Sequence, residues 1–322
     1  MRLVILGTGP FAVPAFGGLF ETAHEIAALV TRPLEPARGR EIPAATPLRD
    51  LVHAHGTPIF DPPDINGPDA LASLQSCRAD LLVVCDYGQI LSAGALATAR
   101  LGGLNVHGSL LPKYRGAAPI HWAVYHGEKE TGVSVIHMTP RIDAGPLVAQ
   151  ARTEIGPDET AVELEKRLAE IGAWLVRRAI DSLESGRLEA LPQDHAQASR
   201  APRLKKTDGL IDWTRSAAAI KNHVRAMEPW PKTYTFWRQP QGPPLRLILG
   251  PVSVVEPSAA ADDWPVAPGA VLEASGNRLV IAAGAGAVAP ASVQPAGKRL
   301  MTVDEFLRGH RVQPGQRFGP EG

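Results

Sequence analysis

Residues 2–12 read RLVILGTGPFA, and this stretch decides the fold class of the chain. The continuous apolar run Leu3–Leu6 is typical of a parallel strand that is buried on both faces. Residues Gly7–Pro10 then form a turn, and the sequence after them predicts a helix that ends near Leu19. A buried strand that is followed at once by a helix indicates an α/β sheet.

The same alternation continues through the first half of the chain. We expect strands at Ile26–Thr31, Leu81–Cys85, Leu104–His107 and Val133–Met138. From Thr160 to Leu183 apolar residues recur near helical spacing, which predicts a long amphipathic helix that closes the first domain. Together these elements predict a Rossmann-like, doubly wound parallel sheet.

The second half of the chain has a different amino-acid composition. Residues 192–207 are rich in Gln, Ala, Ser, Pro and Lys, as in a linker. Short β-like runs separated by Gly and Pro follow, and they suggest a small β-barrel. These runs are Thr233–Trp237, Leu245–Leu249, Val252–Val255, Ala270–Glu273, Arg278–Ala282 and Ala291–Gln294. We therefore expect a first domain over residues 1–190, a linker over 191–207 and a barrel over 208–322, with Pro-rich loops at 240–244 and 257–268.

Composition limits the possible function classes. The 322 residues are long for one domain, and a hydrophobic content of 44% is ample for two cores. The formal net charge is zero, which argues against a protein coated in basic residues. Residues 200–246 nevertheless hold ten Lys and Arg against three acidic residues, so a polyanion could bind locally there.

Cysteine usage and the amino terminus indicate the compartment. The two cysteines, Cys77 and Cys85, lie in apolar surroundings without Cys-x-x-Cys spacing. This pattern argues against a disulfide framework or a cysteine-built metal site and favours a reducing compartment. No apolar run is long enough for a signal sequence or a membrane span, so we expect a soluble cytoplasmic protein that contacts no membrane.

The glycine-rich turn Gly7–Ala12 nearly fits the dinucleotide fingerprint Gly-x-Gly-x-x-Ala. That fingerprint also needs an acidic residue at the end of the second strand, where it binds a ribose. The second strand here runs into Thr31-Arg32-Pro33, which has no carboxylate. We therefore interpret the turn as tight packing of strand against helix and expect no nicotinamide cofactor.

Three polar residues are candidates for catalysis. Asn105 and His107 are two residues apart, so they point to the same face of a strand, at the carboxyl end where open α/β sheets place ligands. Asp143 supplies a carboxylate. An amide, an imidazole and a carboxylate can orient a proton acceptor and stabilise an oxyanion with no metal and no covalent intermediate. This combination suits the transfer of a small acyl group to an amine.

Each of these residues also has a purely structural explanation. Asn105 could cap a turn, His107 could be a satisfied structural histidine, and Asp143 could shape the turn before Ala144-Gly145. The functional interpretation therefore depends on the wider pattern in which the three residues occur.

The wider pattern contains Asn105–Pro112 (Asn-x-His-Gly-Ser-Leu-Leu-Pro), Lys113–Ile120, Glu130–Val133 and Asp143–Gly145. It resembles the 10-formyltetrahydrofolate-dependent formyltransferases along nearly the whole chain. Later blocks resemble those members that act on a charged initiator tRNA, and these blocks are Ala201–Leu204, Ile211–Trp213, Arg225-Ala226, Pro229–Pro231 and Gln294–Lys298.

The resemblance implies transfer of a formyl group from 10-formyltetrahydrofolate to the α-amino group of methionyl initiator tRNA, and an oligonucleotide-binding-type barrel. Asn105 would then donate to the anionic oxygen, and His107 would take the amine proton or polarise the carbonyl. Asp143 would fix the tautomer and orientation of His107. The residues implied to bind the folate are Ser109, Leu110, Leu111 and Pro112, with Asp86, Tyr87, Gly88 and Ile90 near its pterin.

On the acceptor side, the loop Arg32–Arg40 resembles the basic loop of the family that reaches the acceptor end of tRNA. The residues implied to bind tRNA are Arg38 and Arg40 in this loop, with Arg203, Lys205, Lys206 and Lys298 further along the chain. Asp86 departs from the family pattern, which usually has a small apolar residue there. The carboxylate could bond pterin nitrogens or cap the turn. We expect a monomer without a metal.

Three other functions are left open. A formyl-folate enzyme that acts on a sugar-nucleotide amine or glycinamide ribonucleotide, or that hydrolyses the donor, would share Asn105, His107 and Asp143 but would not need the basic stretch or the barrel. A non-catalytic RNA-binding protein would have no use for the three polar residues. A nicotinamide oxidoreductase would depend on the glycine-rich turn discounted above.

Overall fold

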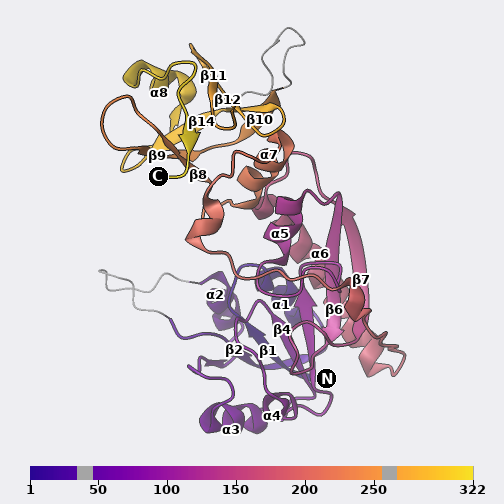
Figure 1. Cartoon of the computed structure of the whole chain (residues 1–322). Helices are drawn as coiled ribbons and strands as arrows, with labels where there is room; N and C mark the ends of the chain where they lie inside the picture. Colours follow the sequence, from indigo (N-terminus) through magenta and orange to yellow (C-terminus); the bar gives the residue numbers. More distant parts are fainter. Residues whose placement is uncertain (35–45, 256–266, 322) are drawn as a thin grey trace. The chain divides into compact units, whose positions relative to one another are not determined.

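The computed structural model of the chain describes residues 1–34, 46–255 and 267–321 (Figure 1). The chain divides into two compact units, which we describe separately. Unit 1 comprises Met1–Ile120, Lys129–Ile155 and Glu163–Arg203, and unit 2 comprises His121–Glu128, Gly156–Val162 and Leu204–Gly322. Within the described ranges, no helix has the length and apolar character needed to cross a membrane.

Unit 1 is built on a seven-stranded sheet with the order β3-β2-β1-β4-β5-β6-β7. Strands β1, β2, β4 and β5 are parallel, as predicted, and the short parallel strand β3 was not predicted. Their bounds, with those of the last two strands, are β1 (Arg2–Gly7), β2 (Glu25–Val30), β3 (Ile59–Phe60), β4 (Leu81–Cys85), β5 (Gly103–His107), β6 (Glu130–His137) and β7 (Leu147–Glu154). The sheet is therefore mixed, because β6 pairs antiparallel with β5 and with β7.

The direction of β6 corrects the expectation that Val133–Met138 would extend a parallel sheet. A buried apolar run looks the same in both directions, so its direction depends on the path of the preceding chain. That chain passes through α5 (Pro119–His126) and enters β6 from the opposite end. Strand β7 was not predicted, because its sequence LVAQARTE lies at the edge of the sheet with no fully buried residue and so lacks a buried apolar run.

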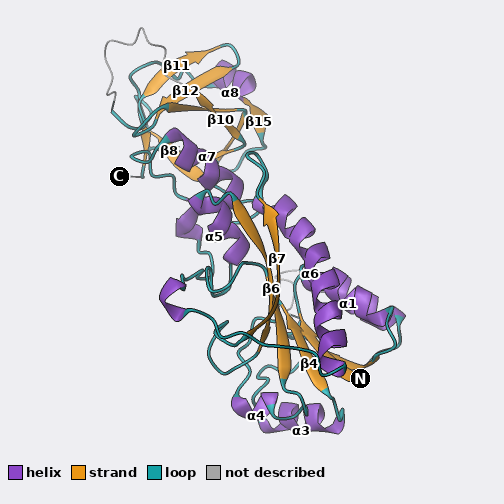
Figure 2. Ribbon diagram, turned by 90° about the vertical axis from the view of Figure 1, so that its right-hand side faces the viewer, coloured by secondary structure: helices purple, strands orange, loops and turns teal. Residues whose placement is uncertain are grey.

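Helices cover both faces of this sheet, as the doubly wound prediction requires (Figure 2). On one face, Val4 and Leu6 of β1 share a core with Leu74 of α3 and Leu96 of α4. On the other face α6 packs closely, since a Cβ atom on its Gly172 would lie 3.1 Å from Val106 of β5. The helices of this part are α1 (Ala12–Phe20), α2 (Pro47–Ala54), α3 (Pro68–Ser76), α4 (Ala93–Leu96) and α6 (Ala161–Glu184), so both predicted helices are confirmed.

The turn after β1 is a close packing of strand against helix. A Cβ atom on Gly7 would lie 2.7 Å from the backbone oxygen of Cys85 and 2.7 Å from the ring of Phe16 in α1. A side chain at this position would separate α1 from the sheet. The close packing by itself requires glycine at this position.

Unit 2 contains antiparallel strands in two sheets around one core, in agreement with the predicted β-rich C-terminal part. The sheet orders are β10-β13-β12-β11 and β15-β14-β9-β8-β16. Leu247, Ile281 and Phe306 are among the residues of the shared core. The strands are β8 (Tyr234–Trp237), β9 (Leu245–Leu249), β10 (Val252–Val255), β11 (Val271–Ser275), β12 (Arg278–Ala282), β13 (Ala287–Pro290), β14 (Ser292–Pro295), β15 (Met301–Thr302) and β16 (Phe318–Gly319).

Besides most of α5, the described part of unit 2 contains two helices that the sequence analysis did not predict. They are α7 (Ala217–Ala226) and α8 (Val303–Gly309). Each begins with a side-chain cap, because Ser216 accepts from Ala219 N and Thr302 accepts from Glu305 N. Most of the expected loop at 257–268 lies outside the described residues.

Candidate active site

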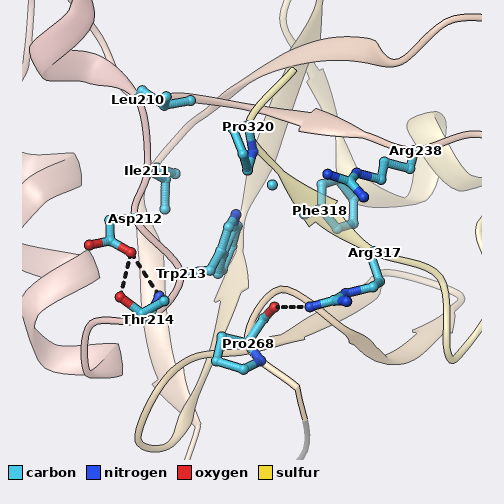
Figure 3. A pocket seen from close by; sticks show the side chains of 11 residues that line it. Leu210, Ile211, Asp212, Trp213, Thr214, Arg238, Pro268, Arg317, Phe318 and Pro320 are labelled. Carbon is cyan, nitrogen blue, oxygen red and sulfur yellow. Dashed lines mark hydrogen bonds between the residues drawn. The ribbon is translucent and has the colours of Figure 1, made fainter. Parts of the chain in front are cut away.

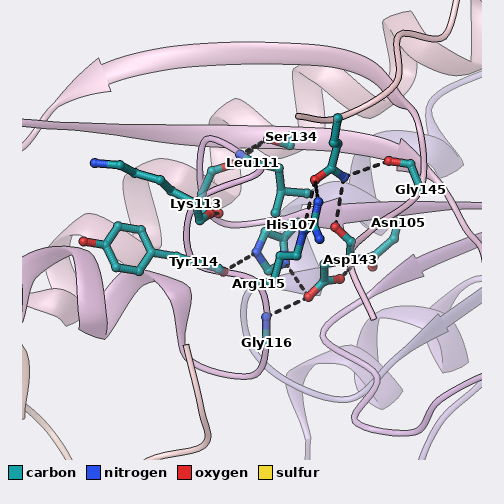
Figure 4. A network of polar contacts seen from close by, with 12 residues as sticks. Asn105, His107, Leu111, Lys113, Tyr114, Arg115, Gly116, Ser134, Asp143 and Gly145 are labelled. Carbon is teal, nitrogen blue, oxygen red and sulfur yellow. Dashed lines mark hydrogen bonds and ion pairs between the residues drawn. The ribbon is translucent and has the colours of Figure 1, made fainter. Parts of the chain in front are cut away.

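The three polar residues that the sequence singled out come together at the end of β5 (Figure 4). Asn105 Nδ2 donates to Asp143 Oδ1 over 3.3 Å. His107 Nδ1 lies 3.6 Å from Asp143 Oδ2, and the imidazole is only 6% exposed. Asp143 reaches this point from the loop between β6 and β7. An amide, an imidazole and a carboxylate therefore face one another in unit 1.

A backbone carbonyl holds the imidazole from its other side. His107 Nε2 lies 2.9 Å from the carbonyl oxygen of Tyr114. Because a carbonyl oxygen only accepts hydrogen bonds, Nε2 must carry a proton, and the neutral ring is the Nε2–H tautomer. Nδ1 is then the nitrogen that is free to take up a proton, and it faces the carboxylate. The Tyr114 carbonyl, rather than Asp143, thus sets the tautomer, while Asp143 is placed to stabilise an imidazolium.

The loop that carries Asp143 is tightly constrained. Asp143 has a left-handed backbone with φ 48°, a conformation that Asp tolerates better than most residues. Its Oδ2 accepts a hydrogen bond from Gly116 N over 2.9 Å. At Gly145 the backbone passes so close to His137 O that any Cβ atom would collide with it. The carboxylate is therefore placed by the backbone and not by a freely rotating side chain.

The segment Gly108–Gly116 wraps around the histidine, and hydrogen bonds fix its shape. The Ser109 hydroxyl is buried and donates to Lys113 O over 2.8 Å. Ser134 Oγ donates to Ser109 O and accepts from Leu111 N. Gln150 Nε2 donates to Leu111 O over 2.8 Å. Of the residues implied to bind folate, Ser109 and Leu111 are buried, whereas Leu110 and Pro112 are partly exposed.

The turn after β4 holds the other residues implied to bind folate. Tyr87 is buried in the core with its hydroxyl unpartnered among the described residues, and desolvation raises its pKa to about 12. Gly88 is exposed, and so is Ile90, at 57%. Ile142, which precedes Asp143, is 55% exposed. Ile142 thus leaves exposed apolar surface next to Asp143 in the chain, and Ile90 leaves more on the turn after β4.

Asp86 packs over the glycine-rich turn. Its backbone oxygen accepts from Thr8 N over 3.0 Å, and its φ is 49°. A Cβ atom on Gly9 would collide with Asp86 Oδ2, so the carboxylate fills the space above Gly9. Solvent reaches part of this side chain, but neighbouring protein atoms desolvate the carboxylate and raise its pKa to about 6, against the opposing effect of Arg203. Desolvation and the Asp86 charge also raise the pKa of Glu165.

The basic residues implied to bind tRNA are only partly covered by the structure. Arg38 and Arg40 lie outside the described residues. Arg203 belongs to unit 1 and is exposed, and Lys205, Lys206 and Lys298 are exposed in unit 2. These four side chains are accessible, and their role stays a prediction.

Unit 2 also contains a cavity of about 480 Å³ (Figure 3). Its lining includes the rings of Trp213 and Phe318, with Arg238 and Arg317 also contributing. None of the predicted site residues lines it. The polar constellation of unit 1 therefore remains the candidate active site.

Comparisons with known proteins show the family of this chain. The family model described as "Formyl transferase" matches residues 1–180, and "Formyl transferase, C-terminal domain" matches residues 203–311. This chain belongs to the formyl transferase family. Its relatives include proteins named methionyl-tRNA formyltransferase from Rhodopirellula baltica, 47% identical over 99% of this chain and 96% of that protein, and from Solibacter usitatus, 38% identical over 99% of both.

Solved structures share the fold of this formyl transferase family member at low sequence identity. A crystal structure of HypX from Aquifex aeolicus in complex with tetrahydrofolic acid aligns with a TM-score of 0.61 and 16% identity, over 95% of this chain and 47% of that one. An N-formyltransferase from Helicobacter canadensis, in complex with folinic acid and dTDP-3-aminofucose, aligns with a TM-score of 0.65 and 15% identity, over 92% of this chain and 99% of that one.

The pKa of Asp86 leads to a prediction for stability. The folded carboxyl binds its proton more tightly than an unfolded one does, because its pKa rises from 3.8 to about 6. Ionisation above pH 6 therefore destabilises the folded chain. Asp86→Asn keeps the shape without the charge, so it should raise the urea midpoint of unfolding at about pH 8 and have less effect at about pH 5. An equal effect at both pH values would contradict this explanation.

Proposed function

We propose that this chain transfers the formyl group of 10-formyltetrahydrofolate to the α-amino group of methionine on initiator tRNA. The observation that carries the proposal is the 47% identity, over 99% of this chain, to a protein named methionyl-tRNA formyltransferase. The geometry of Asn105, His107 and Asp143 supports it, because these groups suit attack of an amine on a carbonyl. The reaction belongs to translation initiation, so we place the protein in the cytoplasm.

Asn105 stabilises the charge that develops on the formyl oxygen. When the neutral amine adds to the formyl carbon, the carbonyl carbon becomes tetrahedral and its oxygen becomes anionic. The carbonyl then re-forms as the bond between the formyl carbon and N10 of the folate breaks, and N10 leaves with a proton as tetrahydrofolate. One N–H of the Asn105 amide donates to Asp143, and the second N–H is available for this oxygen. A single donor of this kind is typically worth about 2.7–4 kcal/mol of transition-state stabilisation.

His107 and Asp143 receive the proton that the amine loses. Nε2 of His107 is bound to the Tyr114 carbonyl, so Nδ1 is the ring atom that can accept a proton. The imidazolium that results lies beside the Asp143 carboxylate, which stabilises the positive charge. A positioned acid–base group of this kind contributes roughly 10²–10⁴-fold to the rate.

The folate donor fits the surface beside this site. We assign its contacts to the segment Ser109–Pro112 and to the turn that contains Asp86, Tyr87, Gly88 and Ile90. The Ser109 hydroxyl is already bonded to Lys113 O, so this residue offers its backbone rather than its side chain. The partly exposed Leu110 and the exposed Ile90 supply apolar surface for the pterin ring.

The tRNA is held through its phosphates. Arg203, Lys205, Lys206 and Lys298 are exposed and carry the positive charge that phosphates need. Arg38 and Arg40 are further contacts in this proposal, although they lie outside the described residues. Such contacts release counterions, so the affinity should fall steeply with added salt.

The direct test supplies the full-length chain with 10-formyltetrahydrofolate and methionine-charged initiator tRNA. We expect formyl-methionyl-tRNA, detected after hydrolysis of the ester. Asn105→Ala should lose roughly 10²–10³-fold in kcat, because one oxyanion donor is removed, while the affinity for tRNA stays the same. If the wild-type chain formylates a sugar-nucleotide amine and yields no formyl-methionine, the proposal is wrong.

A second test concerns the basic residues. The double variant Lys205→Ala/Lys206→Ala should lower the slope of log Kd against log salt by about 2, since each lost phosphate contact removes about 1. Arg308→Ala is the matched control, because this exposed arginine of unit 2 is paired with Asp304 at 2.6 Å. An unchanged slope in the lysine variant would count against these tRNA contacts.

A further inference from the structure

One buried glutamine outside the catalytic segments joins them together. Gln193 follows α6 and is only 6% exposed. Its Nε2 donates to Asp143 O over 2.9 Å and to Gly145 O over 2.7 Å. Its Oε1 accepts from Arg115, with Nε at 3.1 Å and Nη2 at 2.5 Å. Gln193 thus connects the loop that carries Asp143 to the segment that ends at Gly116.

The hydrogen-bond pattern requires a carboxamide at this position. An amide has two N–H donors and one oxygen with two lone pairs, and Gln193 uses all of them. A carboxylate of the same shape would turn negative oxygens toward two carbonyl oxygens. An apolar side chain would leave buried polar partners unsatisfied, which is costly. The chemistry of the residue, rather than its volume, therefore matters here.

The two ends of this connection are the two supports of His107. Arg115 follows Tyr114, whose carbonyl holds Nε2 of the imidazole (Figure 4). On the other side, Gln193 binds the backbone of Asp143, whose carboxylate lies 3.6 Å from Nδ1. The distance between the Asp143 carboxylate and the imidazole thus depends on the relative position of the segment around Arg115 and the loop that carries Asp143.

The chain after Gln193 strengthens this arrangement. Arg115 N donates to Ser199 O over 2.8 Å, and Ala201 N donates to Arg115 O over 2.7 Å. Ser199 Oγ accepts from Tyr114 N over 2.9 Å. Residues 199–201 therefore lie alongside the segment around Arg115 like a short parallel strand. This pairing holds the chain that carries Gln193 in place against that segment.

We propose that Gln193 is a positioning residue for formyl transfer. Its carboxamide fixes the Asp143 carboxylate against His107 by tying the backbone of Asp143 and Gly145 to the guanidinium of Arg115. The inference rests on the proposed function for its kinetic readout, and on the four hydrogen bonds for its geometry. A displacement of about 1 Å in such a constellation can cost about 10²-fold in rate.

The test compares Gln193→Glu and Gln193→Met with Gln197→Ala in the full-length chain. Gln197 is the matched control, because it is exposed on the same segment and its side chain bonds only Asp194. Both Gln193 variants should lose about 10²-fold in kcat, with KM for charged tRNA within threefold of wild type, and Gln197→Ala should match wild type. The loss in kcat without a matching change in KM separates a displaced Asp143 carboxylate from a weakened tRNA site.

Circular dichroism and thermal melting identify variants that remain folded, and the kinetics are read on those. If a folded Gln193 variant keeps wild-type kcat, the positioning role is wrong even though the enzyme works. If both variants unfold, a crystal structure of Arg115→Met decides instead: Asp143 in its wild-type place overturns the inference. Inactive wild-type and Gln197→Ala proteins would contradict the proposed function itself.

Discussion

The hydrogen bond from His107 Nε2 to the Tyr114 carbonyl is the interaction on which the rest of the site depends. It orients the ring so that Nδ1 faces Asp143, and it determines which nitrogen can exchange a proton. The bond forms only because the chain after β5 doubles back, with Tyr114 in a left-handed conformation at φ 63°. Ser109, Ser134 and Gln150 stabilise that return path through buried and partly buried hydrogen bonds.

Side-chain periodicity made part of this site predictable from sequence. Asn105 and His107 are two residues apart, so a strand had to place them on one face. The antiparallel direction of β6 was not predictable, because burial alone carries no direction. The Tyr114 carbonyl was missed for a different reason: any residue type supplies a backbone carbonyl, so no sequence pattern marks it. Only the family motif that contains Lys113–Gly116 indicated that this segment contributes to the site.

Gln193 shows how composition can mislead. The Gln, Ala, Ser and Pro around it are typical of a linker, yet residues up to Arg203 belong to unit 1 and are hydrogen-bonded to the catalytic segments. Asp86 and Gly9 also form a pair that only the fold reveals, because the Asp86 carboxylate occupies the space that the missing side chain of Gly9 leaves. The sequence could not predict this contact or those of Gln193, because the partners are far apart along the chain.

The account is tested most directly by the ¹⁵N chemical shifts of the His107 imidazole, assigned by comparison with His107→Gln and followed from acidic to alkaline pH. We predict that the neutral ring carries its proton on Nε2, which donates to the Tyr114 carbonyl. A neutral ring with its proton on Nδ1 would contradict the account, because the Tyr114 carbonyl could not then hold the ring.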